Sequence, residues 1–479
     1  MSYTPENNPY IPGDPYSYDL KWIVEKLKEC NSVISSLDDK IKALIIKFLD
    51  EHDPVYFNTA GDLIASDVNV GALVYIMGYH NVGDGGANYY IITDDYNDVL
   101  SSFFYLTLDV PNKWAIPVFT TEYAYPEMFG AYGDNTNDDT VAIQMTLDNF
   151  KVIRFKPNQY LIESPVTVPG NRILEGSGRY QTRIHAVGNA LELADRYIKI
   201  SDMTIKGSDT GYGIVYPDNN NAHFIIIKNC DINNFNNGIR YINITWNCTI
   251  QDVRINNCTI GINCAFAGGC MLNTYINLYI NSCERLMRLS GFRQAKFIGC
   301  NFGFTNETNP NILIDNVCDV SFDSCNFECD EQCSQAGLID IGSRSTSFYN
   351  CIFKPNLTSN GGVFIVSNPD RLIINNCVIS AHADNQAVLT RKFFNNSYFS
   401  CATYGGVSIE DSQINVSLGQ YTASKITGFK IRNRIPFSGT NIDPASSSVF
   451  EDYLHIDNYH PCYYNGTNII DATDGSVVV

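Results

Sequence analysis

The sequence contains no long hydrophobic run. None of its apolar stretches approaches the roughly 18 residues that a membrane-spanning helix requires. The first segment, Met1–Asp19, is polar and rich in proline, and it has neither the basic start nor the apolar run of a secretory signal. We therefore expect a protein without a transmembrane helix or a membrane partner, made in a cytoplasm.

Positive charge is also scarce. Lysine and arginine together number 32, against 51 aspartates and glutamates, which gives a net charge of −19 at neutral pH. Binding to nucleic acid requires a basic surface that neutralises phosphates. The composition therefore argues against DNA and RNA as partners, and for the same reason it disfavours anionic membranes.

Histidine is rare, with 7 residues, whereas cysteine is plentiful, with 16. Thiols stay reduced in a reducing cytosol, so these cysteines do not predict a disulfide framework. The 30 tyrosines and the many asparagine, glycine and serine residues favour strands and tight turns over helices. The positions of the cysteines must therefore explain why there are so many.

An internal repeat supplies that explanation. Short segments ending in Asn-Cys, Ser-Cys or Gly-Cys recur at intervals of mostly 25 to 28 residues, with one shorter interval of 17 residues between Cys283 and Cys300. The cysteines of this series are Cys230, Cys258, Cys283, Cys300, Cys325, Cys351 and Cys377. The residues just before them are of types that tolerate bends between strands. A period of this length is typical of a solenoid.

Alignment on the cysteines predicts columns of buried residues. Three positions before them stand Ile227, Ile255, Ile280, Phe297, Phe322, Phe348 and Ile374. Two positions after them stand Ile232, Ile260, Phe302, Phe327, Phe353 and Ile379, with Arg285 as the exception. Alternating apolar and polar residues indicate strands with one buried face. Stacked coils bury such faces against each other, which predicts an all-β, right-handed parallel β-helix.

A stacked column suits cysteine, which behaves as a small buried hydrophobe. We therefore expect these thiols to be free and buried. A ladder runs lengthwise and does not converge on one point, so it predicts no metal site and no cofactor. The four-residue spacing of Cys325, Cys329 and Cys333 could suit a ligand set, but no histidine lies nearby.

The N-terminal region carries a heptad pattern. Apolar residues alternate three and four positions apart at Leu20, Ile23, Leu27, Cys30, Ile34, Leu37, Ile41, Leu44 and Phe48. This predicts a coiled coil, and the mixture of Ile and Leu favours three strands; an amphipathic helix packed on its own chain is the alternative. We divide the chain into a helical attachment segment (1–50), a small β-rich head module (51–124), the β-helix (125–415) and a C-terminal cap (416–479).

Residues 125–178 resemble the opening segment of the pectate-lyase-like β-helix superfamily. The matches are Phe129 to Asp134, Asp138 to Gln144, and Pro157 to Ile162. Asp139 or Thr140 is expected to cap the helix that follows. The segments GYHNVGDGGANYYI and YYNGTNIIDATDG are similar to modules of phage tail proteins. The resemblance is thus to a phage tailspike or tail appendage protein.

That resemblance implies a homotrimer in the phage tail of the virion, made in the host cytoplasm. It would dock on other phage tail proteins through its N-terminus, and would bind and could depolymerise bacterial surface polysaccharide. The alternatives are a non-enzymatic structural tail appendage protein and a bacterial surface glycan-active enzyme. No Gly-His-Gly occurs, so no catalytic residue carries over from polygalacturonase-type members. Whether the chain is a glycosidase, a lyase or not an enzyme stays open.

The candidate site residues come from the outward positions of the rungs. Glycoside cleavage needs two carboxyl groups about 5 to 10 Å apart, for which we select Glu284, Asp323 and Glu328. Arginines can hold acidic sugars by paired hydrogen bonds, and aromatic rings can stack on sugars. The candidates for substrate binding are Arg254, Tyr279, Arg285, Arg288, Arg293, Lys296 and Tyr349. The short interval before Cys300 predicts a notch beside them. The alternative is that these are solvated surface charges.

Overall fold

The structure, a computed structural model, describes residues 53–379 with internal gaps, and beyond them the backbone of further strands. The gaps are residues 95–103, 120, 217–222, 243–244, 265–269, 305–310, 316–318, 330–338, 343–344, 355–361 and 367–370. The predicted coiled coil and Cys333 lie outside the described residues. None of the described helices is long and apolar enough to cross a membrane. The chain divides into two compact units, with the boundary between Glu122 and Tyr123.

The first unit is a small α/β module around one sheet. Its elements are β1 (Val55–Phe57), α2 (Ala60–Ile64), β2 (Leu73–Ile76), β3 (Asn88–Thr93), β4 (Leu106–Thr107) and β5 (Trp114–Val118). The strand order is β1-β2-β3-β5-β4. Alternate residues of β3 are buried, and Leu63 of the helix packs with Val74, Ile76 and Tyr90 in the core. The alternation of buried and half-buried residues in β3 therefore gives the sheet one apolar face, which packs against the helix.

The second unit begins with the segment that resembles β-helix openings. It contains the 3₁₀ helix η3 (Pro126–Phe129), β7 (Asp134–Asp138) and α3 (Thr140–Asn149). The expected cap is corrected here. Asp139 is at the N-cap position of α3 but makes no capping bond, and its carboxylate accepts from the backbone N–H of Tyr132, 2.6 Å away. Asp138 instead accepts from the N–H of Thr140 at 3.0 Å.

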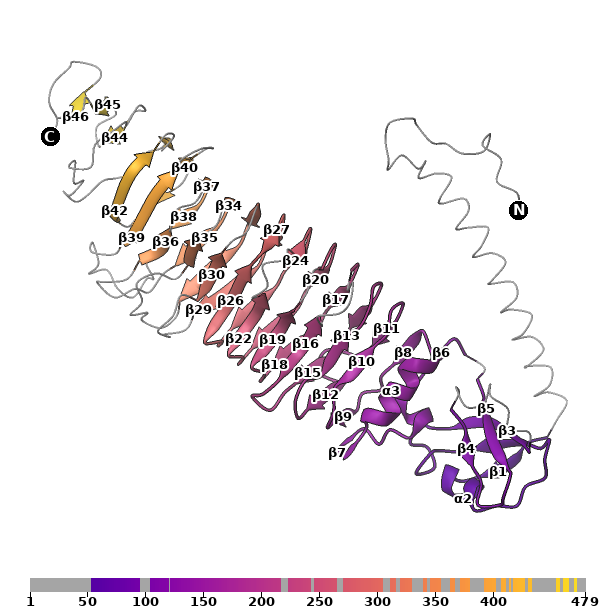
Figure 1. The fold of residues 1–479 in the computed structure, drawn as a ribbon. Coiled ribbons are helices and arrows are strands. Elements are labelled where there is room, and N and C mark those ends of the chain that lie inside the picture. Colours follow the sequence, from indigo (N-terminus) through magenta and orange to yellow (C-terminus); the bar gives the residue numbers. More distant parts are fainter. Residues whose placement is uncertain are drawn as a thin grey trace, which may run out of the picture. The chain divides into compact units, whose positions relative to one another are not determined.

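Stacked rungs follow, each with one strand in each of three parallel sheets (Figure 1). Sheet I contains β6 (Tyr123–Ala124), β8 (Val152–Arg154), β11 (Ile173–Glu175), β14 (Lys199–Ser201), β17 (Ile226–Lys228), β20 (Thr249–Gln251), β24 (Thr274–Ile276), β28 (Lys296–Ile298), β31 (Val320–Asp323), β34 (Ser345–Tyr349), β37 (Arg371–Asn375), β40 (Gly406–Glu410) and β43 (Lys430–Arg432).

Sheet II contains β7, β9 (Gln159–Ile162), β12 (Arg183–Ala186), β15 (Thr204–Lys206), β18 (Asp231–Asn233), β21 (Arg254–Asn256), β25 (Tyr279–Asn281), β29 (Asn301–Phe304), β32 (Asn326–Cys329), β35 (Ile352–Lys354), β38 (Val378–Ile379) and β41 (Gln413–Ile414). Sheet III contains β10 (Val166–Val168), β13 (Leu191–Leu193), β16 (Tyr212–Tyr216), β19 (Asn237–Tyr241), β22 (Ile260–Cys264), β26 (Arg285–Ser290), β30 (Ile312–Asp315), β33 (Ile339–Gly342), β36 (Gly362–Val366), β39 (Lys392–Cys401) and β42 (Ser417–Ile426).

Two smaller sheets complete the described strands. One pairs β23 (Cys270–Met271) with β27 (Phe292–Arg293), and the other joins β44 (Leu454–Ile456), β45 (His460–Tyr464) and β46 (Ile469–Asp471). The stacked rungs confirm the predicted parallel β-helix. Crossovers between parallel strands of one sheet are right-handed in nearly all proteins, which agrees with the expected hand.

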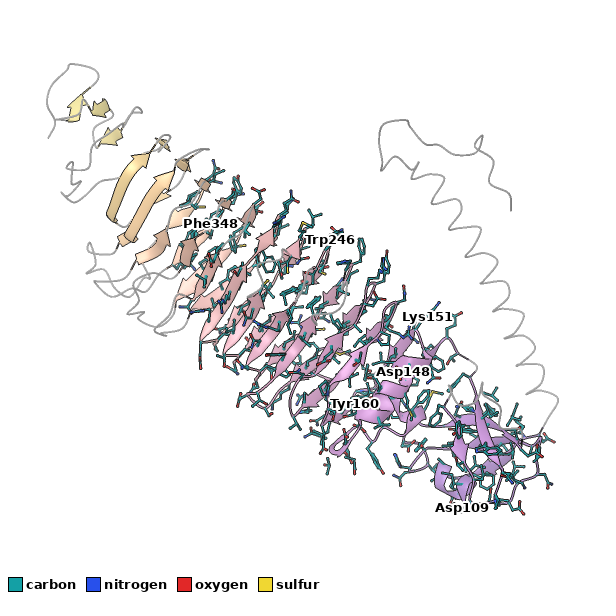
Figure 2. The ribbon with its side chains drawn as sticks, viewed as in Figure 1. Asp109, Asp148, Lys151, Tyr160, Trp246 and Phe348 are labelled. Atoms are coloured by element: carbon teal, nitrogen blue, oxygen red, sulfur yellow. The ribbon has the colours of Figure 1, made fainter. Side chains whose placement is uncertain are left out.

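Aromatic ladders fill the core. The rings of Tyr275, Phe297, Phe322 and Phe348 stack on successive strands of sheet I, with centroids 4.4, 4.8 and 5.0 Å apart (Phe348 is labelled in Figure 2). A second ladder, Phe302, Phe327 and Phe353, stacks in sheet II and meets the first edge-on. Because parallel strands lie about 4.8 Å apart, identical columns bring such rings into contact.

The single cysteine column of the sequence alignment is wrong, because the cysteines occupy two corners of the rung. The corner between sheets I and II holds Met203, Cys230, Val253, Leu278, Cys300, Cys325, Cys351 and Cys377. The corner between sheets II and III holds Phe235, Cys258 and Cys283. Both corners need a bend followed by a buried apolar side chain. The same Asn-Cys or Ser-Cys pair can therefore form the bend at either corner.

The predicted state of these thiols is confirmed. All seven cysteines of the series are free and buried. The residues before them have the left-handed backbone that a sharp bend requires, for example Asn229 with φ 51° and Asn350 with φ 53°. Burial raises the pKa of the Cys230 thiol to about 12, so it stays protonated and packs as an apolar group.

Candidate functional site

The structure distributes the predicted site residues over all three faces of the β-helix. Sheet I carries Lys296, Asp323 and Tyr349; sheet II carries Arg254, Tyr279 and Glu328; sheet III carries Arg285 and Arg288; β27 carries Arg293; and Glu284 lies at the corner between sheets II and III. They therefore do not form one site. Arg254 and Tyr279 are the pair that the structure brings together most closely.

Arg254 and Tyr279 are direct neighbours in register on the outer face of sheet II. The Arg254 guanidinium lies 5.8 Å from the centre of the Tyr279 ring, within the range of a cation–π contact. Its Nη1 also donates to the hydroxyl of Tyr180 at 3.0 Å. Tyr180 is 58% exposed, so an arginine and two tyrosines together form an open surface, which we call the sheet II platform.

A folded turn between β11 and β12 places Tyr180 against Arg254 of sheet II, although the two residues are far apart in the sequence. In the turn, the N–H of Gly178 donates to the carbonyl of Asp202 at 3.0 Å, with a φ of 148° that only glycine adopts readily. Arg179 donates to the carbonyl of Asp252, in the rung before Tyr279, and Thr204 donates to the carbonyl of Arg179. The turn is therefore tied down across several rungs.

A row of asparagines borders the platform. Asn233, Asn256 and Asn281 follow one another in register at the third position of their strands. The Asn281 side chain donates to the Tyr279 hydroxyl at 3.1 Å. Amide groups both donate and accept hydrogen bonds, as sugar hydroxyls do. The row therefore extends the platform with groups that suit a polyhydroxyl ligand.

A groove continues this surface around the next corner. Its volume is about 330 Å³, and its lining residues are Asp209, Phe235, Asn257, Cys258, Thr259, Ser282, Cys283 and Glu284. Asn257 and Ser282 directly follow Asn256 and Asn281, so the groove and the asparagine row are continuous. The lining places Glu284 in a concave site, as a ligand-binding role requires.

The groove holds two carboxylates, Asp209 and Glu284. Asp209 precedes β16 and Glu284 precedes β26, three strands further along sheet III. Three strand spacings amount to about 14 Å between the backbones, beyond the ~9.5 Å that an inverting pair of carboxyl groups spans. The described geometry therefore favours binding of a ligand at both ends of the groove over a preformed catalytic pair.

The other two carboxylates selected from sequence make contacts typical of surface structure. The Asp323 carboxylate accepts from the Asn350 side chain at 3.0 Å, in a row that continues to Asn376. Glu328 pairs with Lys354 at 3.4 Å across one strand spacing. Asp323 lies on sheet I and Glu328 on sheet II, so neither shares the groove with Glu284.

Two arguments that singled out this region need correction. Arg285 does not break an apolar column, because it pairs with Ile260, which in turn pairs with Asn237, in a mixed column of sheet III. The interval between Cys283 and Cys300 is not a short rung, because these cysteines occupy different corners. The rung from Leu278 to Cys300 has 22 residues and its two neighbours have 25 each, so this rung is shorter by much less than the cysteine spacing indicated, and the notch stays a prediction.

Sequence reasoning missed Tyr180 and Asp209. Tyr180 lies outside the regular rungs, and 74 residues separate it from Arg254. Asp209 lies in the longer turn before β16 and has a left-handed φ of 65°. A signal existed for each, since Gly176, Gly178 and Gly207 to Gly211 mark turns longer than the repeat requires.

No protein-family model matches the sequence. The curated protein "Depolymerase 1, capsule KN3-specific" of Klebsiella phage KN3-1 is 25% identical, over 43% of this chain and 31% of its own length. Tailspike protein 2 from Escherichia coli O157:H7 bacteriophage CAB120 matches with a TM-score of 0.58 at 17% identity, over 77% of this chain and 52% of its own.

The gp42 tailspike of Acinetobacter phage vb_AbaP_AS12 matches with a TM-score of 0.60 at 17% identity, over 84% of this chain and 80% of its own. The chain spans about a third of the length of the depolymerase and about half of tailspike protein 2. The predicted fold is thereby confirmed: this chain has the parallel β-helix fold found in phage tailspike proteins.

Proposed function

We propose that this chain is a phage tail spike or receptor-binding virion protein that binds bacterial surface polysaccharide. The sheet II platform, the asparagine row and the groove form the binding surface. One observation carries the proposal. Tyr180, Arg254 and Tyr279 present an open aromatic and cationic surface that is continuous with a polar groove. An extended saccharide can follow such a surface over several rungs.

The comparisons support the same function. A relative with detectable sequence similarity is a capsule-specific phage depolymerase, and the solved structures with the same fold include phage tailspikes. A protein with this role is located in the virion tail. The amide, hydroxyl and aromatic side chains of the surface suit sugars, whereas the net charge of −19 opposes nucleic acid.

Depolymerisation is the second candidate activity, favoured by the capsule depolymerase relative. Glu284 is then the carboxyl group that we assign to bond cleavage, because it lines the groove. Asp209 is the second carboxyl group in that groove. Cleavage by Glu284 and Asp209 together would require that a bound polysaccharide draws the two side chains closer to each other. Asp323 and Glu328 remain weaker candidates because they lie outside the groove.

A homotrimer is part of this proposal. It rests on the heptad pattern of residues 20–48 and on the likeness to tailspikes. The N-terminal segment would then hold the copies in parallel and dock on other phage tail proteins.

The test incubates the purified full chain with a panel of bacterial capsular polysaccharides, among them one from a KN3-type Klebsiella. Binding is read by retention of the protein on immobilised polysaccharide, and cleavage by the size distribution of the sugar. Retention by at least one polysaccharide supports binding, and a reduced sugar size that Glu284→Gln abolishes and Glu328→Gln preserves supports cleavage at the groove. No retention by any of them would contradict the proposed function.

A further inference from the structure

The outer face of sheet I differs from that of sheet II in its isoleucine side chains. Between β14 and β28 its exposed and half-buried outward side chains are Lys199, Ile226, Lys228, Thr249, Gln251, Thr274, Ile276, Lys296 and Ile298. None of them is a carboxylate, although the chain has 51 acidic residues. Ile226 and Ile298 are 43% and 39% exposed. This face is therefore apolar with a few positive charges.

A ridge of large apolar residues borders this face at the corner where sheet III leads into sheet I. Tyr197, Phe224 and Leu272 are 51%, 43% and 49% exposed there. Each directly precedes a strand of sheet I by two residues. The ridge and the outer face of sheet I from β14 to β28 therefore form one continuous surface, which we call the sheet I face.

The ridge residues have an unfavourable backbone conformation. Tyr197, Phe224 and Leu272 have φ of 60°, 57° and 57°. The same position in other rungs holds Asn171, Asn247, Gln294 and Asp319, with φ between 53° and 58°. Asn and Asp tolerate this left-handed region, whereas bulky residues in it cost on the order of 1 kcal/mol or more each. Exposed bulky residues at this position therefore suggest a role that asparagine would not fill.

The geometry of the rings indicates what kind of partner they fit. Tyr197 stacks on Phe224 with centroids 5.1 Å apart and an interplanar angle of 7°, and His223 stacks on Trp246 at 4.9 Å and 17° (Trp246 is labelled in Figure 2). Stacking turns one face of each ring toward its partner, so that face is closed to a ligand and the ring edges stay exposed. Sugars stack on ring faces, whereas ring edges and isoleucine side chains pack against apolar protein surface.

We propose that the sheet I face packs against a second copy of this chain. The inference rests on the proposed homotrimer and assigns the surface that holds its β-helices together. The charge of the face fits this partner, because the exposed Lys228 and Lys296 can approach a chain with a net charge of −19. The polar sheet II platform then faces solvent and stays free for polysaccharide.

The first experiment measures lysine acylation of the native full chain, with mass spectrometry of the modified peptides. Lys228 and Lys296 on the sheet I face and Lys206 on sheet II are all exposed in the single chain. We expect Lys228 and Lys296 to react at least tenfold more slowly than Lys206 in the native assembly, and at equal rates after denaturation. Equal rates in the native assembly, or a native protein that is monomeric, would overturn the proposal.

The second experiment compares two matched substitutions. Ile298 on sheet I and Ile352 on sheet II are 39% and 40% exposed, so the two positions are matched in exposure, and urea unfolding of each variant measures its cost to the single chain. Ile298→Glu should raise the concentration at which the assembly dissociates by tenfold or more, measured by sedimentation, and Ile352→Glu should not. Equal effects, or no effect of either, would contradict the assignment.

A third variant separates assembly from folding. Phe224→Asn places at the ridge a residue that tolerates its φ of 57°, so the chain should fold at least as well. We expect weaker assembly with an unchanged circular dichroism spectrum. Unchanged assembly would count against the ridge. Polysaccharide retention is measured on the same samples. No retention of the wild type, together with protected lysines, would refute the glycan proposal while leaving the sheet I face in place.

Discussion

At the residue scale, the corners of the rung show how little sequence a β-helix needs to turn. A residue with positive φ is followed by a side chain that fits a narrow buried space, as in Asn350-Cys351. The Cys351 thiol donates to the carbonyl of Tyr349 at 3.2 Å, so the bend also satisfies a backbone acceptor. Methionine, valine and leucine occupy the same position in other rungs, which shows that packing, and not thiol chemistry, selects the residue.

The first prediction concerns this packing. Cys325 is 1% exposed, and its thiol donates to the carbonyl of Phe297 at 3.4 Å. Cys325→Asp places a charge without a partner in the core and should lower the free energy of unfolding by more than about 3 kcal/mol. Cys325→Ala, the control, leaves a small cavity and should cost about 1 kcal/mol. Urea unfolding measures both, and equal effects would contradict the assigned position.

The second prediction is a pH dependence from Asp139. Burial raises the pKa of this carboxyl to about 6, even though backbone N–H groups of Tyr132 and Gly133 oppose the shift. The pKa of an aspartate is about 3.9 in an unfolded chain. Between about pH 4 and pH 6 the folded state therefore binds the proton more tightly than the unfolded state does. The stabilisation is fully present below about pH 4 and is lost as the pH rises through about 6.

The measurement compares unfolding of the wild type and Asp139→Asn at several pH values. From pH 4 to pH 7 the wild type should lose about 3 kcal/mol relative to the variant, since two pKa units correspond to that free energy. Other carboxylates, including the buried Glu127, titrate in both proteins and cancel. A difference that does not change with pH would show that Asp139 keeps an ordinary pKa.

The third prediction tests the contribution of Tyr279 to the sheet II platform. Tyr279→Ala should weaken polysaccharide retention about tenfold, which corresponds to ~1.4 kcal/mol. Tyr349 is the matched control, because it is also half-buried and projects from a strand, but lies on sheet I. Tyr349→Ala should leave retention unchanged. A larger effect of Tyr349→Ala would move the site to sheet I.

At the element scale, one turn adds a projecting aromatic side chain to the outer face of sheet II, where we propose that polysaccharide binds. Residues 176–182 cross several rungs, and Arg179 fixes them by donating to the carbonyl of Asp252. The turn therefore acts through Tyr180, which it holds against Arg254. The strands below it would exist without the turn, because their ladder bonds do not involve it.

The fourth prediction follows from that tether. Arg179→Ala should release the turn and weaken polysaccharide retention nearly as much as Tyr180→Ala, with little change in unfolding. Arg183, exposed in β12 close by, provides the control, and Arg183→Ala should retain binding. Full retention by Arg179→Ala would show that the turn keeps its position without this bond.

At the scale of the whole molecule, the three sheets have different chemistry. Sheet II presents amides and aromatics, and sheet I presents isoleucine and lysine between β14 and β28. A column of outward residues repeats along the axis at about 4.8 Å, so each sheet can carry one kind of surface over a long distance. A β-helix can thus bind a polymer on one face and another subunit on a second.

The fifth prediction is the mass of the assembly. Light scattering of the full chain should give about three times the 53.5 kDa chain mass. Deletion of residues 1–50 tests the heptad pattern, because the remaining chain keeps the sheet I face and should associate more weakly than the full chain. A monomer at micromolar concentration in both proteins would contradict the homotrimer and the sheet I face together.

The sequence by itself determined the kind of fold and most of the core. Alternating residues such as Phe322 and Phe327 point inward whatever their neighbours, and a stacked fold repeats that pattern in every rung, so local periodicity was sufficient. Only the tertiary structure decided which corner each cysteine occupies, since both corners impose the same local requirement. It alone joined Tyr180 to Arg254 and Asp209 to the groove with Glu284. Turns outside the repeat are positioned by contacts between rungs, which no local pattern encodes.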